Sequence, residues 1–192
     1  MSRRCRPNGY DSRQHAALAA CNFDTIYTTN FEHHIEEALR DSGRPARALA
    51  RLGDFMDPCP RDTCRVIKFH GDIGAPETIV LTEAQFFDRF RLEAAPDQCL
   101  RADMLSKSFL FLGYSFSDVN IRYIWYRMDQ MRRQGVGSGP VAPHMRCYWA
   151  TFGAGLVQPQ LLDQWHIDMI TLDPNDKEGS VVELLNTLNT SP

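Results

Sequence analysis

The sequence contains no apolar run that approaches the ~18 to 20 consecutive residues that a membrane-spanning helix needs. Its N-terminal stretch, MSRRCRPNGYDSRQHAALAACNF, starts with arginines but has no apolar core, so it does not predict a secretory signal. We therefore expect a cytoplasmic protein whose six cysteines are reduced. These absences argue against a membrane partner.

The chain also lacks a strong net charge, because 21 basic and 24 acidic residues give a formal charge of −3. Lysine is scarce, with only Lys68, Lys107 and Lys177, and the arginines are scattered rather than gathered in one stripe. This balance argues against nucleic acid as a partner. The apolar share of 43% in 192 residues is instead enough for one domain with a buried core.

Short apolar segments alternate with helix-like segments along the chain. The expected strands are residues 25–29, 65–69, 109–112, 147–149 and 167–172, and helices are expected after residues 30, 82 and 118 and over 181–188. This alternation predicts an α/β fold with a mostly parallel sheet flanked by helices. We expect residues 1–17 to be a poorly defined N-terminal segment and residues 18–190 to form the domain.

Three of the expected strands end in polar or glycine-containing motifs. In an open parallel sheet, ligands bind beyond the carboxyl ends of the strands. An amide, an imidazole, hydroxyls and glycine-opened turns would meet at that rim and suit the ribose and phosphates of a nucleotide. The motif residues are Thr28, Thr29 and Asn30 on the first strand, His70, Gly71 and Asp72 on the second, and Gly113, Ser115 and Asp118 on the third.

Each of these residues also has a purely structural interpretation. Asn30 and Asp118 could cap the helices that follow them, because both residue types are favoured at helix N-termini. His70 could close a turn and Gly113 could end a strand. His33 and His34 are neighbours on the expected first helix, where both are expected to face solvent.

The three motifs together resemble those of the short prokaryotic sirtuin-like domains of antiphage defence, such as the NAD-degrading effectors of Thoeris-type systems. They read IYTTNFE (26–32), KFHGD (68–72) and GYSFSD (113–118), in this order. The resemblance implies a Rossmann-like domain that takes NAD as substrate and cleaves its nicotinamide–ribose bond. It implies a catalytic pair, Asn30 and His70, and NAD-binding residues Thr28, Thr29, Gly71, Asp72, Gly113, Ser115 and Asp118.

The chemistry of the implied pair fits this reaction. Nicotinamide in NAD is already a cationic leaving group, so the enzyme has to stabilise an oxocarbenium-like transition state and position a nucleophile. The Asn30 amide can orient a water molecule or a ribose hydroxyl without adding charge. An imidazole with an ordinary pKa of about 6.5, such as that of His70, can accept a proton near neutral pH.

The chain departs from the family pattern before Asn30. Sirtuin-like domains open with a strand and a glycine-rich turn that cradles the pyrophosphate, and no such sequence precedes Asn30. Without that strand, the apolar neighbours in the sheet would be uncovered. We therefore expect low stability, or association through a homo-oligomer or a missing or fused partner segment. The strand-end acid, usually an aspartate, is Glu32 here.

The cysteine spacing predicts no zinc site. Deacetylating sirtuins carry two C-x-x-C pairs after the histidine, whereas Cys59 and Cys64 precede His70, and Cys99 and Cys147 stand alone. Hydrolysis of NAD is therefore the leading hypothesis, and an NAD-dependent protein deacylase is the third. The second is a truncated, non-catalytic nucleotide-binding or interaction module, which the lack of the glycine-rich turn favours.

Overall fold

The computed structural model describes residues 12–89, 91, 93–114, 123, 126, 127, 130, 146–153, 162, 163 and 167–190. The strands are β1 (Thr25–Thr28), β2 (Ala46–Leu49), β3 (Cys64–Lys68), β4 (Phe109–Phe111), β5 (Cys147–Thr151) and β6 (Ile167–Thr171). The helices are α1 (Arg13–Ala20), α2 (His34–Asp41), α3 (Leu52–Met56), the 3-10 turn η1 (Pro76–Thr78), α4 (Glu83–Arg89), α5 (Ala95–Met104) and α8 (Lys177–Thr190).

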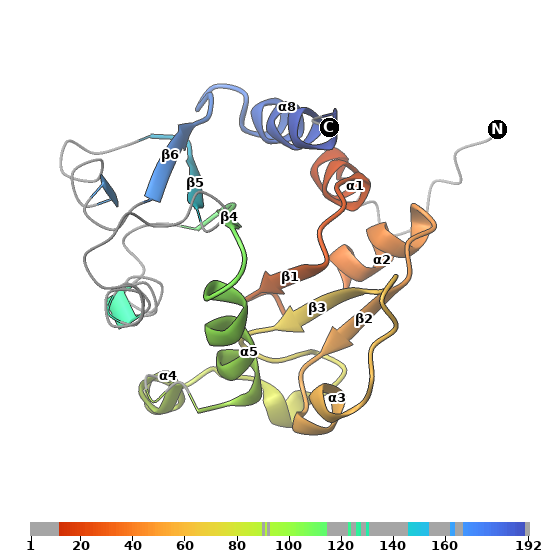
Figure 1. Ribbon diagram of the computed structural model, residues 1–192, viewed down its shortest axis with the longest axis vertical. Helices are drawn as coiled ribbons and strands as arrows, with labels where there is room; N and C mark the ends of the chain where they lie inside the picture. Colours follow the sequence, from red (N-terminus) through yellow and green to blue (C-terminus); the bar gives the residue numbers. More distant parts are fainter. Residues whose placement is uncertain are drawn as a thin grey trace.

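The strands form two parallel sheets of three strands each, in the orders β1-β3-β2 and β4-β5-β6. Ile26 lies opposite Val66 in the first sheet, and Leu110 lies opposite Tyr148 in the second. Figure 1 shows the two sheets side by side, with helices around them. The predicted α/β fold with parallel, Rossmann-like sheets flanked by helices is confirmed.

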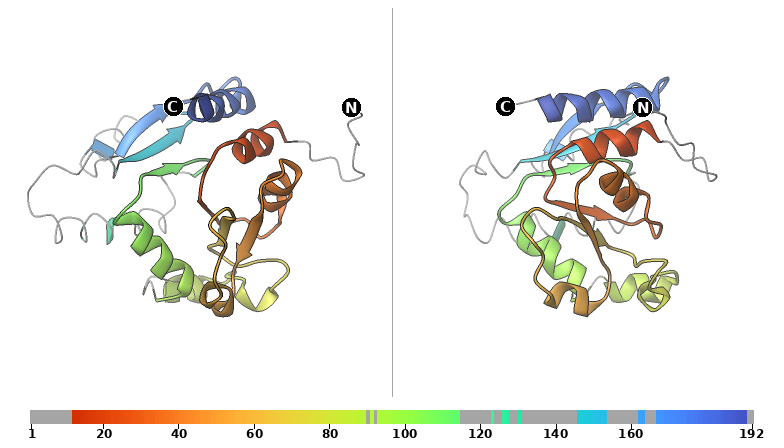
Figure 2. Two further views of the ribbon diagram at one scale, coloured as in Figure 1. Left: turned by 45° about the vertical axis from the view of Figure 1, so that its right-hand side comes forward. Right: turned by 90° about the vertical axis from the view of Figure 1, so that its right-hand side faces the viewer.

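Helix α1 joins the two sheets on one face. Its residue Ala19 packs with Leu39 of α2 and Val66 of β3, beneath the first sheet. Ala17, two residues earlier, packs with Leu185 of α8, in a cluster that includes Leu112 after β4. Figure 2 shows α8 lying along α1 in both views. On the opposite face, α5 contributes Leu100 and Met104 to a cluster around Trp149.

Several elements differ from the sequence-based expectation. Helix α1 begins at Arg13, inside the segment 1–17, and helix α2 begins at His34 rather than directly after Asn30. Strand β2 reads ARAL, which lacks the β-branched residues that identify strands from sequence, and pairing with β3 holds it in the sheet. Helix α5 is a further element that the sequence-based expectation lacks.

None of the described helices is long and apolar enough to cross a membrane.

The carboxyl end of β3 carries a buried ion pair. The side chain of Lys68 is fully buried, and its Nζ lies 2.8 Å from Oε1 of Glu36 on α2. The same ammonium group donates to the carbonyl oxygen of Glu32. Apart from this ion pair, neither oxygen of Glu36 has a hydrogen-bond partner among the described residues. Each charge therefore depends on the other for compensation of its lost hydration.

Replacing Lys68 by Met should lower the free energy of unfolding by about 3 kcal/mol, because the carboxylate of Glu36 would remain buried without its cation. Urea denaturation followed by circular dichroism measures this loss. The double variant Lys68→Met/Glu36→Leu should recover most of it. Lys107→Met is the control, since Lys107 pairs with Asp103 while 38% of its side chain is exposed; it should cost less than about 1 kcal/mol. Equal losses for the two single variants would contradict this account.

Candidate functional site

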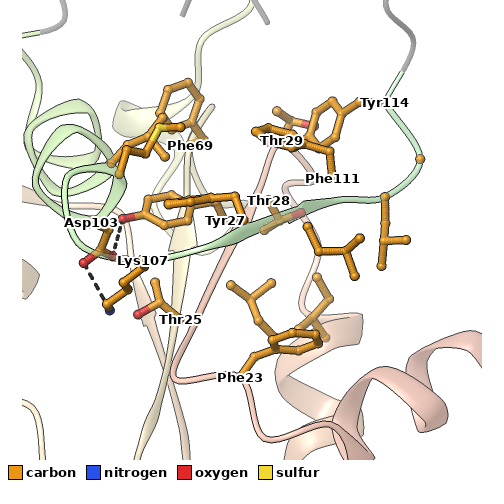
Figure 3. Close-up of a pocket in the computed structure, with 18 of the residues that line it drawn as sticks. Phe23, Thr25, Tyr27, Thr28, Thr29, Phe69, Asp103, Lys107, Phe111 and Tyr114 are labelled. Atoms are coloured by element: carbon orange, nitrogen blue, oxygen red, sulfur yellow. Dashed lines mark hydrogen bonds and ion pairs between the residues drawn. The ribbon is translucent and has the colours of Figure 1, made fainter. Parts of the chain in front are cut away.

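A cavity of about 1060 Å³ lies between the two sheets. One wall is formed by β1 and the residues that follow it, and the opposite wall by β4 and the residues around it. Figure 3 shows these two segments and the side chains between them. The volume lies slightly above the range that is usual for small-molecule sites, about 300–1,000 Å³.

Five of the nine predicted site residues line this cavity, from the carboxyl ends of β1, β3 and β4. They are Thr28, Thr29, Asn30, His70 and Gly113. The amide and the imidazole of the implied catalytic pair therefore border the same space. Gly71 and Asp72 follow His70 but are not among the lining residues. Ser115 and Asp118 lie outside the described residues.

The Asn30 side chain is exposed at the end of β1. The Asn30 N–H donates to the hydroxyl of Thr28 at 3.1 Å, which folds the chain back at this point. Helix α2 begins four residues later, with His33 at its N-cap position. The helix-cap interpretation of Asn30 is therefore wrong, and α2 makes no use of its amide.

The ring of His70 is held between two phenylalanines. Its centroid lies 5.7 Å from that of Phe69 and 5.1 Å from that of Phe86, which meets it edge-on at 87°. The His70 carbonyl also accepts a hydrogen bond from Val80 N–H. Phe86, which also lines the cavity, is a site residue that sequence reasoning missed, because three phenylalanines in one helical segment are typical of core packing.

The backbone around Gly71 requires a glycine at this position. Its φ is +102°, and a Cβ built there would lie 2.4 Å from the carbonyl oxygen of Thr78 and 2.6 Å from the Cα of Ile79. Gly113 also has a positive φ, +73°, but nothing lies within 4 Å of an added Cβ. The first glycine allows close backbone contact, and the second permits the positive φ of the turn after β4.

The buried carboxylate of Asp72 binds His33. Nε2 of His33 lies 2.8 and 2.9 Å from the two Asp72 oxygens, and Gly74 N–H donates to Oδ1 at 2.6 Å. Asp72 is only 5% exposed. The side chain of His33 remains 40% exposed, so it faces solvent in part, and the sequence-based prediction missed only its contact with Asp72. Because His33 follows Asn30 and Asp72 follows His70, the pair ties together the two loops that carry the implied catalytic residues.

A second polar network lies at the opposite end of the cavity. The hydroxyl of Tyr27 donates to Asp103 at 2.8 Å, and Lys107 and Arg65 approach the same carboxylate at 3.1 and 3.5 Å. Burial, and secondarily the charge of Asp103, raises the pKa of Tyr27 well above its ordinary value. Tyr27 therefore stays protonated at physiological pH and attaches β1 to α5.

Among the described residues, no group of three or more His, Cys, Asp or Glu side chains is arranged to hold a metal ion. The five described cysteines are not in disulfides. Burial raises the pKa of Cys21, Cys64 and Cys99, so these thiols are poor nucleophiles.

Residues 24–170 match the SIR2-like domain family. The chain is also similar to proteins named NAD(+) hydrolase ThsA. The chain is 35% identical over 126 residues to the protein of this name from Cytobacillus dafuensis. The aligned region covers 64% of this chain and 25% of that protein. The protein of this name from Acinetobacter baumannii (strain 532279) is 34% identical over 125 residues. This aligned region covers 62% of the present chain and 26% of the Acinetobacter protein. The chain thus spans about a quarter of the length of these curated relatives.

Alanine at Gly71 and at Gly113 should have clearly different effects on stability. Gly71→Ala should lower the free energy of unfolding by about 3 kcal/mol, because a positive φ and a backbone clash act together. Gly113→Ala, its control, should cost about 1 kcal/mol, because only the backbone conformation is strained. Urea denaturation of both variants measures the difference. Similar losses would show that residues 78 and 79 do not pack against Gly71.

His33→Ala should lower the free energy of unfolding by about 1 kcal/mol, because the buried Asp72 loses a hydrogen-bond partner. The neighbouring variant His34→Ala is the control. His34 lies 3.9 Å from Glu37 on the surface of α2, so its loss should cost no more than about 0.5 kcal/mol. Thermal unfolding of the two variants compares them directly. An equal shift in Tm would argue against a distinct role for His33.

Proposed function

The chain belongs to the SIR2-like domain family, and from this premise we propose that it hydrolyses NAD to nicotinamide and ADP-ribose. The observation that carries the proposal is that Asn30 and His70 line the same cavity, at the carboxyl ends of neighbouring parallel strands. This is the position at which open α/β sheets bind nucleotides. The names of the relatives, NAD(+) hydrolases, support the same reaction.

The residues around the cavity fit such a substrate. NAD presents two ring systems, ribose hydroxyls and a pyrophosphate. The rim offers the amide of Asn30 and the hydroxyl of Thr29, and aromatic rings from Phe86 and Tyr114 lie beside them. The described lining residues on the rim carry no carboxylate that would repel the pyrophosphate. The pocket is apolar with a few polar groups, which is typical of sites for small organic molecules.

In the proposed reaction, the bond between C1′ of the ribose and the nicotinamide nitrogen breaks, and its electron pair stays with nicotinamide, which leaves as a neutral molecule. Water adds to C1′ and loses a proton. Asn30 orients this water or the ribose hydroxyls, and His70 accepts the proton and passes it to solvent. Contacts with Phe69 and Phe86 hold the imidazole in one orientation, which reduces the cost of positioning it.

The remaining predicted residues divide into two roles in this proposal. Thr29 and Gly113 border the cavity and would contact NAD, as would Ser115 and Asp118 of the same motif. Thr28, Gly71 and Asp72 would act by shaping the loops. Thr28 accepts the Asn30 N–H, Gly71 packs against residues 78 and 79, and Asp72 binds His33.

The resemblance to antiphage effectors extends the proposal to a role in the bacterial cytoplasm, where removal of NAD would disable an infected cell. Two other functions remain as outcomes of the test. A nucleotide-binding module would bind NAD without consuming it, and a protein deacylase would consume NAD only with an acylated peptide.

Incubating the protein with NAD should release nicotinamide and ADP-ribose in equal amounts, as measured by liquid chromatography. Asn30→Ala and His70→Ala should each reduce the rate at least about 100-fold, the typical contribution of a positioned acid–base or orienting group. His34→Ala, a histidine that does not line the cavity, is the matched control and should stay within about twofold of the unmodified protein.

Full activity of either cavity variant would refute the assigned roles. NAD binding measured by calorimetry, with no release of nicotinamide, would instead identify a non-catalytic module. Nicotinamide release that requires an acetylated peptide would identify a deacylase.

A further inference from the structure

Helix α4 contacts the rest of the protein through few side chains. Among its described residues none is fully buried, and only Phe86 and Arg89 are partly buried. The two residues are three positions apart, so they lie on the same face of the helix. Phe86 places its ring edge-on to that of His70, with 5.1 Å between the centroids. The position of α4 relative to the candidate site therefore depends on these two side chains.

The guanidinium group of Arg89 makes two contacts beneath α4. Its Nη2 lies 2.6 Å from Oδ1 of Asp97 on α5, and its Cζ lies 4.6 Å from the centroid of the Phe69 ring. The Asp97 side chain is only 1% exposed, and its other oxygen accepts a hydrogen bond from Ala94 N–H at 3.2 Å. Figure 1 shows α4 beside α5. Because Asp97 is buried and held in one orientation, it keeps the guanidinium over the ring of Phe69.

The ion pair determines where α4 lies more than it adds stability. The Arg89 side chain is 18% exposed, and its Nε is buried without a hydrogen-bond partner among the described residues. Loss of hydration offsets much of the attraction between two buried ions. Once Arg89 is in place, however, it cannot leave without exposing the buried carboxylate of Asp97 to an apolar environment alone. The pair therefore attaches α4 to α5 in one arrangement.

Both rings that contact His70 are held by Arg89. The guanidinium covers the face of Phe69, and a cation in this position is attracted to the ring. The centroid of Phe69 in turn lies 5.7 Å from that of His70. Phe86 stands one helical turn before Arg89, so the attachment of α4 to α5 also keeps the ring of Phe86 against His70. Asp97 and Arg89 thus reach the imidazole by two routes.

Local contacts form the start of α4 but do not attach it to the site. The side chain of Gln85 accepts from Thr82 N–H at 2.9 Å, and the Thr82 hydroxyl accepts from Gln85 N–H at 3.3 Å. This reciprocal cap stabilises the first turn of the helix. Both residues are exposed, so the cap leaves the distance between α4 and His70 undetermined. Loss of Arg89 should therefore leave α4 helical but release it from His70.

We propose that Arg89 is a positioning residue that fixes the orientation of the His70 imidazole through Phe69 and Phe86. This role rests on the proposed hydrolysis of NAD, in which His70 accepts the proton of the attacking water. Arg89 is not among the residues that line the cavity, so it acts on the reaction only through His70. A loss confined to the chemical step lowers kcat and leaves KM unchanged.

The test compares the double variant Arg89→Ala/Asp97→Asn with the unmodified chain. The double change removes both charges, so no ion is left buried alone, and asparagine can still accept the Ala94 N–H. The kcat for nicotinamide release should fall at least about tenfold while KM changes less than about twofold, because a misplaced catalytic group slows the chemical step. Arg89→Lys keeps a cation near Asp97 and should retain a kcat at least about threefold above that of the double variant.

The matched control is Arg91→Ala, since Arg91 is an exposed arginine just after α4. Its kcat and KM should stay within about twofold of those of the unmodified chain. An NMR measurement without NAD tests the contact itself. Cross peaks between the ring protons of His70 and Phe86, which report their proximity, should be present in the unmodified chain and in the control. They should disappear in the double variant, while its circular dichroism remains that of a folded protein.

Cross peaks that persist in the double variant, or that are absent from the unmodified chain, would overturn the proposal. Loss of the cross peaks with an unchanged kcat would overturn it as well, and so would a rise in KM at constant kcat. If the double variant does not fold, Arg89→Met/Asp97→Asn takes its place with the same criteria, because methionine keeps apolar volume over Phe69. If the unmodified chain releases no nicotinamide, the proposed reaction fails, whereas the cross peaks still decide whether Arg89 holds His70.

Discussion

The buried ion pair between Lys68 and Glu36 is the interaction on which the candidate site depends. It holds the carboxyl end of β3 against α2, and Lys68 also binds the Glu32 carbonyl in the loop after β1. A lysine and a glutamate are rarely buried unless they are paired. Separating them would leave each charge buried without a partner, which costs several kcal/mol of folding free energy (about 3–5). The loops that carry Asn30 and His70 are thereby attached to one frame.

The pair between His33 and Asp72 reinforces this frame closer to the cavity. Asp72 was expected to contact the nucleotide, but its carboxylate already binds His33 and the Gly74 amide. The KFHGD motif thus contains two residues with structural partners, Lys68 and Asp72, on either side of the histidine that faces the cavity. The motif therefore supplies His70 to the cavity and also supplies the contacts that fix the position of His70.

The cavity has two parts with different chemistry. At the rim, the polar ends of the strands and the aromatic rings around His70 suit a nucleotide. Deeper, between Tyr27 and Leu110, the lining consists of apolar side chains and the edge strands β1 and β4. The expectation that a central strand would be missing from the sheet arose from a motif absent before Asn30. Among the described residues, no strand pairs with both β1 and β4, so the two sheets remain separate.

The sequence by itself determined the α/β class, the strands with β-branched or continuous apolar residues, and the three motifs at strand ends, because these depend on local patterns of period and residue type. It did not determine β2, whose residues become a strand only by pairing with β3, nor the role of His33, which depends on a residue 39 positions away. Gly71 and Gly113 look equivalent in the chain. Only the packing of residues 78 and 79 makes the first intolerant of a side chain. Tertiary structure decided these features because each one depends on contacts between segments that are distant in the chain.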